Sequence, residues 1–159
     1  MTSGQDRTPY VDALIEFAQS DPGRFNVPGH QGGLGSGLKL HLLAGQTGLA
    51  DDIPALLDGI DVGDRNPFQQ AQQLAAEAWG ARRTWFLING ASQGNQAMCL
   101  AVAHMGGELV VQRNVHSSVI DGMIMAGLKP TFAAPELDPD LGVAHCLTPE
   151  ALSDALDRC

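Results

Sequence analysis

The sequence predicts an α/β fold in which a parallel-type sheet is joined by crossover helices. Short apolar runs at residues 84–88, 109–111 and 131–133 have the length and composition of buried strands. A segment with apolar residues at helical spacing follows each run. The resulting order of strand, helix, strand, helix, strand, helix is that of consecutive βαβ units, which build parallel sheets.

Composition limits both the size of the fold and the class of partner. The chain has 159 residues, of which 44% are hydrophobic, enough for a single domain core. Its net charge of −9 and pI near 4.7 disfavour nucleic acid and anionic membranes as partners. No apolar run has membrane length, and the start lacks the shape of a signal peptide. Three cysteines without metal-type spacing indicate reduced thiols, no metal and a cytoplasmic location.

Residues 1–65 are predicted to form a helix and a glycine-rich arm, distinct from a second part at residues 66–159. Thr8-Pro9 is typical of a helix start, and apolar spacing extends this helix to about Ser20. Pro28–Gly33 is a loop whose glycines allow unusual backbone conformations. Residues 38–60 lack a clean period and predict short helices and turns, with a solvated acidic face around residues 51–64.

Three further helices are predicted from capping residues and apolar spacing. The first begins at Asn66-Pro67 and ends at Gly80. The second follows the strand at 109–111 and ends at Gly127, and the third begins at Thr148, after a loop at 136–144, and continues to Cys159. Their expected buried residues are Ala71, Leu74, Ala75 and Ala78 in the first, Val119, Met123 and Ile124 in the second, and Leu152, Ala155 and Leu156 in the third.

The central stretch, residues 84–95, predicts a strand, a tight turn at Asn89-Gly90 and a helix capped by Ser92. The buried face of that helix is expected to carry Met98, Ala101, Val102 and Met105. Free backbone N–H groups at such a helix start favour a phosphate or another anion, with Ser92 and Gln93 as side-chain donors. The alternative is an ordinary strand-to-helix connection, and neither common nucleotide-loop pattern is matched.

Two turns are expected to meet at one edge of the sheet. In parallel sheets ligands bind beyond the carboxyl ends of the strands, where the turns at 89–93 and 113–118 both lie. His116 in the second turn can stack on a planar ring or act as a general acid or base. The alternative is a histidine that caps or packs at a helix start. His30, in the Pro28–Gly33 loop, has a surface loop histidine as its alternative.

Four stretches together resemble one family. Phe25–Gly33 reads Phe-Asn-Val-Pro-Gly-His-Gln-Gly-Gly, and residues 66–81 form a helix that ends in Ala-Trp-Gly-Ala. Asn89–Asn95 and Arg113–Ser118 follow as a pair of loops. In this order and at these separations, from about Thr8 onward, they resemble the Orn/Lys/Arg decarboxylases, fold-type-I pyridoxal-phosphate enzymes that act on basic amino acids. The resemblance implies a three-layer, aminotransferase-like large domain, of which this chain is the incomplete N-terminal portion.

The resemblance also implies roles for individual residues. Ala91, Ser92 and Gln93 would hold the phosphate of pyridoxal 5′-phosphate, His116 would stack on its pyridine ring, and Ser118 would lie beside it. His30 and its loop would belong to an arm near the active site or the subunit interface of a homodimer or higher oligomer. The family usually has His-Lys-Ser where this chain has His-Ser-Ser at residues 116–118.

The Schiff-base lysine that this chemistry requires is absent from the chain. In the family it lies in a later Ser-x-His-Lys loop, whereas the only lysines here are Lys39 and Lys129, in other contexts. The chain alone is therefore expected to be inactive, as part of a decarboxylase that converts arginine, lysine or ornithine into a polyamine or diamine precursor. One alternative is a truncated, non-catalytic paralogue that binds a partner subunit. Another is a different fold-type-I enzyme, such as an aminotransferase or lyase, which the Pro28–Gly33 loop disfavours.

Overall fold

The computed structural model describes residues 4–159, which divide into two compact units. The first ends at Phe86, and the second is Leu87–Cys159. The predicted division between residues 65 and 66 concerns the domains of the family and stays a prediction. No helix formed by residues 4–159 combines the length and the apolar character that crossing a membrane requires.

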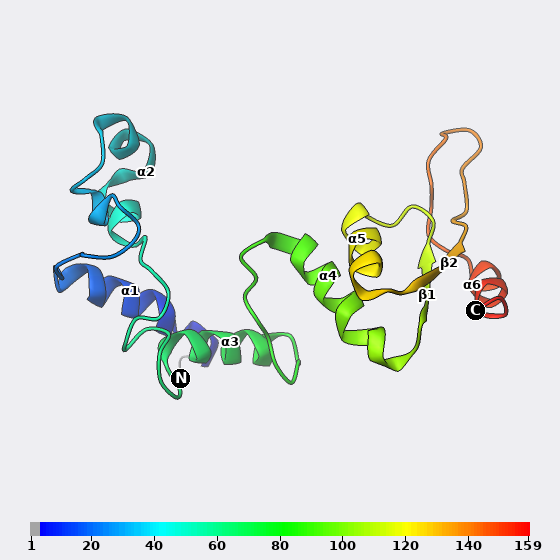
Figure 1. The fold of residues 1–159 in the computed structure, drawn as a ribbon, viewed down its shortest axis with the longest axis horizontal. Coiled ribbons are helices and arrows are strands. Elements are labelled where there is room, and N and C mark those ends of the chain that lie inside the picture. Colours follow the sequence, from blue (N-terminus) through cyan, green and yellow to red (C-terminus); the bar gives the residue numbers. More distant parts are fainter. Residues whose placement is uncertain (1–3) are drawn as a thin grey trace. The chain divides into compact units, whose positions relative to one another are not determined.

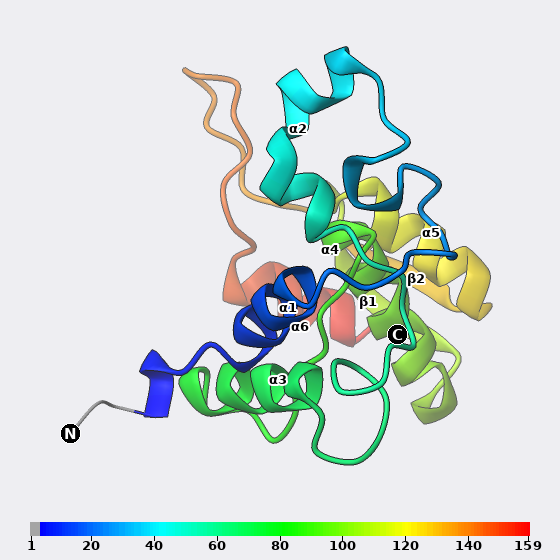
Figure 2. The ribbon, with the colours of Figure 1, turned by 90° about the vertical axis from the view of Figure 1, so that its left-hand side faces the viewer.

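The first unit is built from helices. Their bounds are η1 (Gly4–Asp6), α1 (Pro9–Gln19), η2 (Gln31–Gly33), α2 (Leu38–Ala50) and α3 (Pro67–Ala78). The predicted start of α1 is confirmed, with Thr8 at the N-cap position and Pro9 in the first turn. α1 lies beside α3 (Figure 1, Figure 2), where the Tyr10 and Phe68 rings meet edge to face with their centroids 5.4 Å apart.

The glycine-rich loop of the first unit is folded against α2. The Gln46 amide donates to the Gly32 carbonyl at 3.0 Å, and Arg24 donates to the Ala50 carbonyl at 2.7 Å. Gly32 has φ 68°, and a Cβ there would lie 2.8 Å from the Arg24 guanidinium, so the position requires glycine. α2 itself is interrupted at Gly45, as the lack of a clean period in this segment predicts.

α3 begins and ends where the sequence predicts. Asn66 caps its start and Gly80 follows its end with φ 63°. Leu74 is buried as expected, but Ala78 is exposed and Ala76 is buried instead. The Ala81 N–H donates to the Ala76 carbonyl at 2.8 Å, so the chain folds back over Ala76 rather than Ala78.

Replacing Asn66 with alanine should destabilise the first unit by about 1–2 kcal/mol. The buried Asn66 side chain accepts from the Gln69 N–H at 2.8 Å and donates to the Asp61 and Gly63 carbonyls, each at 2.9 Å. Urea denaturation followed by tryptophan fluorescence measures the change, because both tryptophans lie in this unit. Asn66→Asp keeps the cap acceptor and loses the donors, so we expect an intermediate stability; full wild-type stability in Asn66→Ala contradicts the assignment.

The second unit contains a two-stranded parallel sheet with helices on both sides. Its elements are α4 (Gly90–Val102), η3 (Ala103–Met105), β1 (Glu108–Gln112), α5 (Ser117–Ala126), β2 (Lys129–Ala133) and α6 (Pro149–Leu156). The register runs from Glu108 opposite Lys129 to Gln112 opposite Ala133. Figure 1 shows α5 on one side of the strands and α6 on the other. The predicted α/β architecture, with α5 as a crossover helix between parallel strands, is confirmed for this sheet.

The core of the second unit forms where α4 and α5 pack on β1. Cys99, Val111, Met123 and Leu128 are buried together there. The two helices approach closely at Gly122, where a Cβ would lie 3.0 Å from Cys99 Cβ and from the Gln96 Cα. Gly127 ends α5 in the left-handed conformation at φ 67°, as predicted.

The strand predicted at residues 84–88 is wrong for this structure. The segment from Arg83 to Leu87 has no regular secondary structure and pairs with no strand among residues 4–159. Its apolar side chains are consequently open to solvent, with Trp85 62% and Ile88 91% exposed. An apolar run fixes the conformation of a strand only when a neighbouring strand satisfies its backbone hydrogen bonds.

Two predictions about α4 are also wrong. The helix begins at Gly90 rather than after Ser92, because the Asn89 N–H donates to Gln93 Oε1 at 3.1 Å and closes the turn earlier. The buried face contains Cys99; of the four residues predicted there, Val102 packs on the core, whereas Met98, Ala101 and Met105 are exposed. Gly122 of α5 lies against the side of α4 that carries Cys99. Met98 lies on another side of the helix and is therefore not covered by α5.

The end of the chain differs from prediction in its last helix, where Ala155 is buried as expected but Leu152 and Leu156 are 40% and 56% exposed. The loop at 136–144 and the Thr148 cap are confirmed, the latter by a 3.2 Å hydrogen bond from the Ala151 N–H. α6 ends at Leu156, however, and does not continue to Cys159. The Arg158 side chain donates to the Phe132 carbonyl of β2 at 3.2 Å, and the Arg158 and Cys159 N–H groups bond to carbonyls three residues back, rather than four as in an α-helix.

Candidate functional site

The first turn of α4 presents backbone donors that no side chain caps. Ala91 and Ser92 are exposed within this turn, and Gln93 is half-buried. The first N–H groups of a helix have no partner inside the helix, and Asn89 makes no side-chain cap. Gln93 uses its carbonyl oxygen on the Asn89 N–H, which leaves its amide group available as a donor. The predicted anion-binding turn therefore has open donors in the structure.

His116 occupies the start of α5, where its side chain caps the helix. Nδ1 accepts from the Ser118 N–H at 3.2 Å and lies 2.8 Å from Ser118 Oγ. The capping alternative for His116 is thus present in the structure. The residue is nevertheless exposed, so one edge of the ring is anchored while the ring remains open to a ligand.

Asn95 joins these two places. It lies one turn beyond Ala91 on α4, and its amide donates to Ser118 Oγ at 2.8 Å. Ser118 is 2% exposed and stands in the first turn of α5. The hydrogen bond therefore holds the starts of both helices at the same end of the α4–α5 pair. Sequence reasoning missed Asn95; its position at helical spacing from Ala91 and Ser92 was the available signal.

The electrostatics of this end favour an anion. The first turns of α4 and α5 contain no acidic residue. Each helix start has a partial positive charge from its backbone dipoles. Two such starts together give a local positive potential in a chain whose net charge is −9.

His30 lies in the first unit, within the glycine-rich loop. Its Nε2 pairs with Asp52 Oδ2 at 3.0 Å, and the His30 side chain is 14% exposed. Nδ1 of His30 is buried without a hydrogen-bond partner among the described residues. The His30 side chain is therefore mostly covered, with one nitrogen that has no partner among the described residues.

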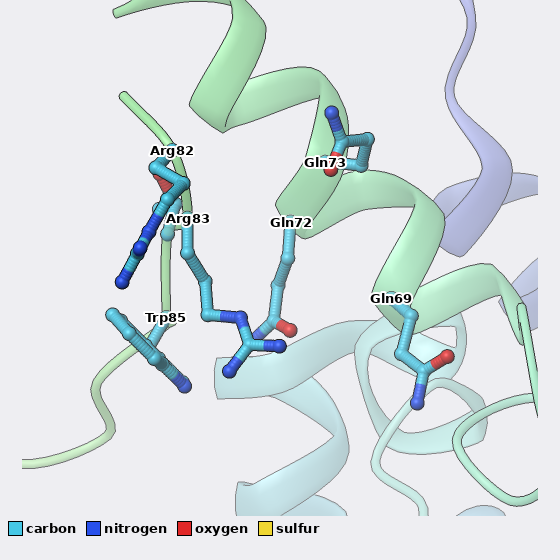
Figure 3. Close-up of a pocket in the computed structure, with 7 residues that line it drawn as sticks. Gln69, Gln72, Gln73, Arg82, Arg83 and Trp85 are labelled. Atoms are coloured by element: carbon cyan, nitrogen blue, oxygen red, sulfur yellow. The ribbon is translucent and has the colours of Figure 1, made fainter.

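A separate, polar cavity of about 470 Å³ lies in the first unit. α3 contributes three glutamines, and the segment after it contributes Arg82, Arg83, Thr84 and Trp85 (Figure 3). The Arg83 guanidinium carbon lies 5.5 Å from the centroid of the Trp85 ring. None of the residues predicted to bind the cofactor lines this cavity, so it is distinct from the α4–α5 site.

Lys129 is engaged in an ion pair. Its Nζ donates to Glu108 Oε1 at 2.6 Å, across the first register pair of the sheet. This hydrogen bond raises the pKa of Lys129 above its ordinary value and lowers the pKa of Glu108. The ion pair therefore favours the charged form of the Lys129 amine, which is not the nucleophilic form.

Comparisons with known proteins find a similar fold in one solved structure and similar sequences in curated relatives. The structure resembles lysine decarboxylase A from Pseudomonas aeruginosa with a TM-score of 0.81 at 24% identity, over 98% of this chain and 22% of that one. An arginine decarboxylase from Halalkalibacterium halodurans is 34% identical over 98% of this chain and 32% of its own length. One from Bacillus anthracis is 36% identical over 97% of this chain and 31% of its own length.

The two curated relatives named above are arginine decarboxylases, and the family is shown by a match to its model. The family model for the major domain of Orn/Lys/Arg decarboxylases matches residues 8–158. The chain belongs to this family. It spans about a third of the length of the arginine decarboxylases to which it is similar.

Proposed function

We propose that the chain is the cofactor-binding, N-terminal portion of the large domain of a pyridoxal-phosphate-dependent decarboxylase. The hydrogen bond between Asn95 and Ser118 supports this most directly, because it joins α4, one turn after its open start, to the residue that contacts His116. A phosphate at one place and a planar ring at the other are parts of a single molecule in pyridoxal phosphate. The complete domain is then a three-layer, fold-type-I domain, with residues 1–65 as an arm and 66–159 as its first part.

The residues of the α4–α5 site fit this cofactor. Ala91, Ser92 and Gln93 offer backbone and side-chain donors to a phosphate, and no acidic group stands in either first turn. His116 offers an exposed imidazole to the pyridine ring, with Ser118 holding its edge. When bound, pyridoxal phosphate supplies the electron sink that allows an amino acid to lose carbon dioxide. The chain's own contribution is to bind the phosphate and to orient the ring.

The proposed substrate is a basic amino acid: arginine, lysine or ornithine. The relatives named as arginine and lysine decarboxylases support this class. Loss of carbon dioxide from such a substrate leaves an amine that is a polyamine or diamine precursor. The reaction is proposed to take place in the cytoplasm.

The full-length protein is proposed to act as a homodimer or a higher homo-oligomer. His30 supports an interface role for the glycine-rich arm, since its buried Nδ1 has no partner among the described residues. Buried polar atoms are almost always hydrogen-bonded, so a group from outside this chain is a reasonable partner.

The chain alone should form no specific covalent adduct with pyridoxal phosphate. The ion pair with Glu108 favours the charged form of Lys129, and Lys39 lies in α2 of the other unit. The experiment is to mix the purified chain with pyridoxal phosphate, reduce with borohydride and map any adduct by mass spectrometry. We expect reversible binding without a stoichiometric adduct. A stoichiometric adduct at Lys39 or Lys129 would mean that the chain has its own amine chemistry and would overturn the proposal.

A non-catalytic role as a subunit-binding module is the second candidate. The exposed apolar side chains between Trp85 and Ile88 favour it, because such a segment associates readily with another chain. The reading frame beyond Cys159 discriminates between the two. A continuation that encodes Ser-x-His-Lys supports the enzyme, and a genuine stop supports the binding module.

A further inference from the structure

We propose that Asn95 is a positioning residue that fixes the orientation and the tautomer of His116 through Ser118. The inference rests on the proposed function in one respect: the ring that it positions is the one assigned to the cofactor. Asn95 donates to Ser118 Oγ at 2.8 Å, and Ser118 Oγ lies 2.8 Å from His116 Nδ1. A continuous hydrogen-bonded chain thus runs from α4 to the imidazole at the start of α5.

The backbone of α5 sets the direction of this chain of hydrogen bonds. The Ser118 N–H donates to Nδ1 at 3.2 Å, so Nδ1 is an acceptor and the neutral ring has its proton on Nε2. The Ser118 hydroxyl must then also donate to Nδ1, because two acceptors do not form a hydrogen bond. Its oxygen is left to accept, and the amide of Asn95 supplies the donor.

An acceptor in place of the Asn95 amide would reverse the arrangement. The Ser118 hydroxyl would turn toward residue 95, and Ser118 Oγ and Nδ1 would face each other as acceptors. Nδ1 would then keep only the Ser118 backbone N–H as a donor, and the preference for the proton on Nε2 would weaken. The group at position 95 therefore sets how strongly the Nε2–H tautomer of His116 is favoured.

Burial makes the control effective. Ser118 is 2% exposed, so solvent does not supply the donor in place of Asn95. His116 is exposed, so the anchoring of one edge does not close the ring to a ligand. Asn95 lies outside the Ala91–Gln93 turn proposed to bind the phosphate. Its effect on a ligand is therefore exerted through the imidazole of His116.

Asn95→Asp tests the direction, because aspartate has the shape of asparagine and lacks its N–H donors. We expect the ratio of the Nε2–H to the Nδ1–H tautomer of His116 to fall about fivefold to tenfold, the effect of one hydrogen bond. Long-range ¹⁵N–¹H spectra of the cofactor-free chain measure this ratio when recorded well above the ordinary titration range of histidine. The loss of signals in His116→Gln identifies those of His116.

Two further variants keep the test decisive. Asn114→Asp is the matched control, since it makes the same change of charge at an exposed residue in the loop before His116 and should leave the ratio unaltered. Asn95→Ala removes the donor without adding a charge, and alanine suits a helix, so a smaller fall is expected even if Asn95→Asp does not fold. An unchanged ratio in a folded Asn95 variant, or an equal shift in Asn114→Asp, overturns the proposal.

Titration of the same samples with pyridoxal phosphate separates this inference from the proposed function. Weaker binding by Asn95→Asp than by Asn114→Asp supports both. A tautomer shift in a chain that binds no pyridoxal phosphate supports the positioning by Asn95 and overturns the cofactor assignment.

Discussion

Replacing Gly122 with alanine should destabilise the second unit by about 1–3 kcal/mol. The added Cβ would lie 3.0 Å from Cys99 Cβ, Cys99 Sγ and the Cα of Gln96, and the Cα is backbone that does not move aside easily. α4 and α5 must therefore separate at the centre of the core that Cys99 and Met123 share.

Hydrogen exchange at the Arg113 amide reports this change locally, because that N–H donates to the Ala133 carbonyl at 2.8 Å within the second unit. Gly107→Ala is the matched control, since a Cβ at Gly107 meets no atom within 4 Å. We expect faster exchange in Gly122→Ala and little change in Gly107→Ala. Equal protection in the two variants would show that the close approach of the helices is not a constraint.

Replacing Ala91 with glutamate should weaken the binding of pyridoxal phosphate at least about tenfold. A carboxylate in the first turn of α4 repels the phosphate at short range, where a charge pair is worth several kcal/mol even near a protein surface. The same carboxylate interacts favourably with the helix dipole, so the helix itself should be stabilised by a few tenths of a kcal/mol. Lower affinity together with unchanged or higher stability distinguishes a ligand effect from misfolding.

Isothermal titration of the chain with pyridoxal phosphate measures the affinity. Ala97→Glu provides the control, because Ala97 is exposed further along α4 and the variant has the same net charge. Rising salt should reduce the difference between the two variants, as expected for a charge effect at an exposed site. Equal affinities would exclude the start of α4 as the phosphate site.

The parts of the fold that the sequence predicted well depend on local signals. β1, α5 and β2 are defined by apolar runs of strand length and by Gly127, whose left-handed conformation ends the helix. The start of α3 was predictable because Asn66-Pro67 combines a capping side chain with a first-turn proline.

The parts that were missed depend on neighbours distant in sequence. The run at 84–88 has strand composition, but strand pairing is a property of two segments, and the described residues supply no second one. The buried face of α4 is selected by the space that Gly122 leaves, 23 residues beyond Cys99 along the chain. Periodicity alone defines the buried face of a helix to within about one position. The prediction therefore named Met98 where the structure buries Cys99.

The candidate site was partly predictable for the same reason. A helix start within a few residues of Ala91 and the position of His116 before a helix follow from turn residues and apolar spacing, although the start itself lies at Gly90. The contact of Asn95 with Ser118 does not, because it requires the packing of α4 on α5. For His116 the sequence left two alternatives, a helix cap and an open ring. The structure shows both together, because Nδ1 accepts from the Ser118 N–H while the residue remains exposed.

The His116 side chain accepts a hydrogen bond from a backbone N–H at the start of α5. This cap restricts which residues can replace His116, even without a ligand. Asparagine, aspartate, serine and threonine can take over the helix cap, whereas alanine cannot. Among residues that accept the Ser118 N–H, histidine is the one that also adds an aromatic ring. A descendant that no longer needs the ring should therefore drift toward asparagine or serine, and an asparagine at this position would mark the loss of the ligand while the domain remains folded.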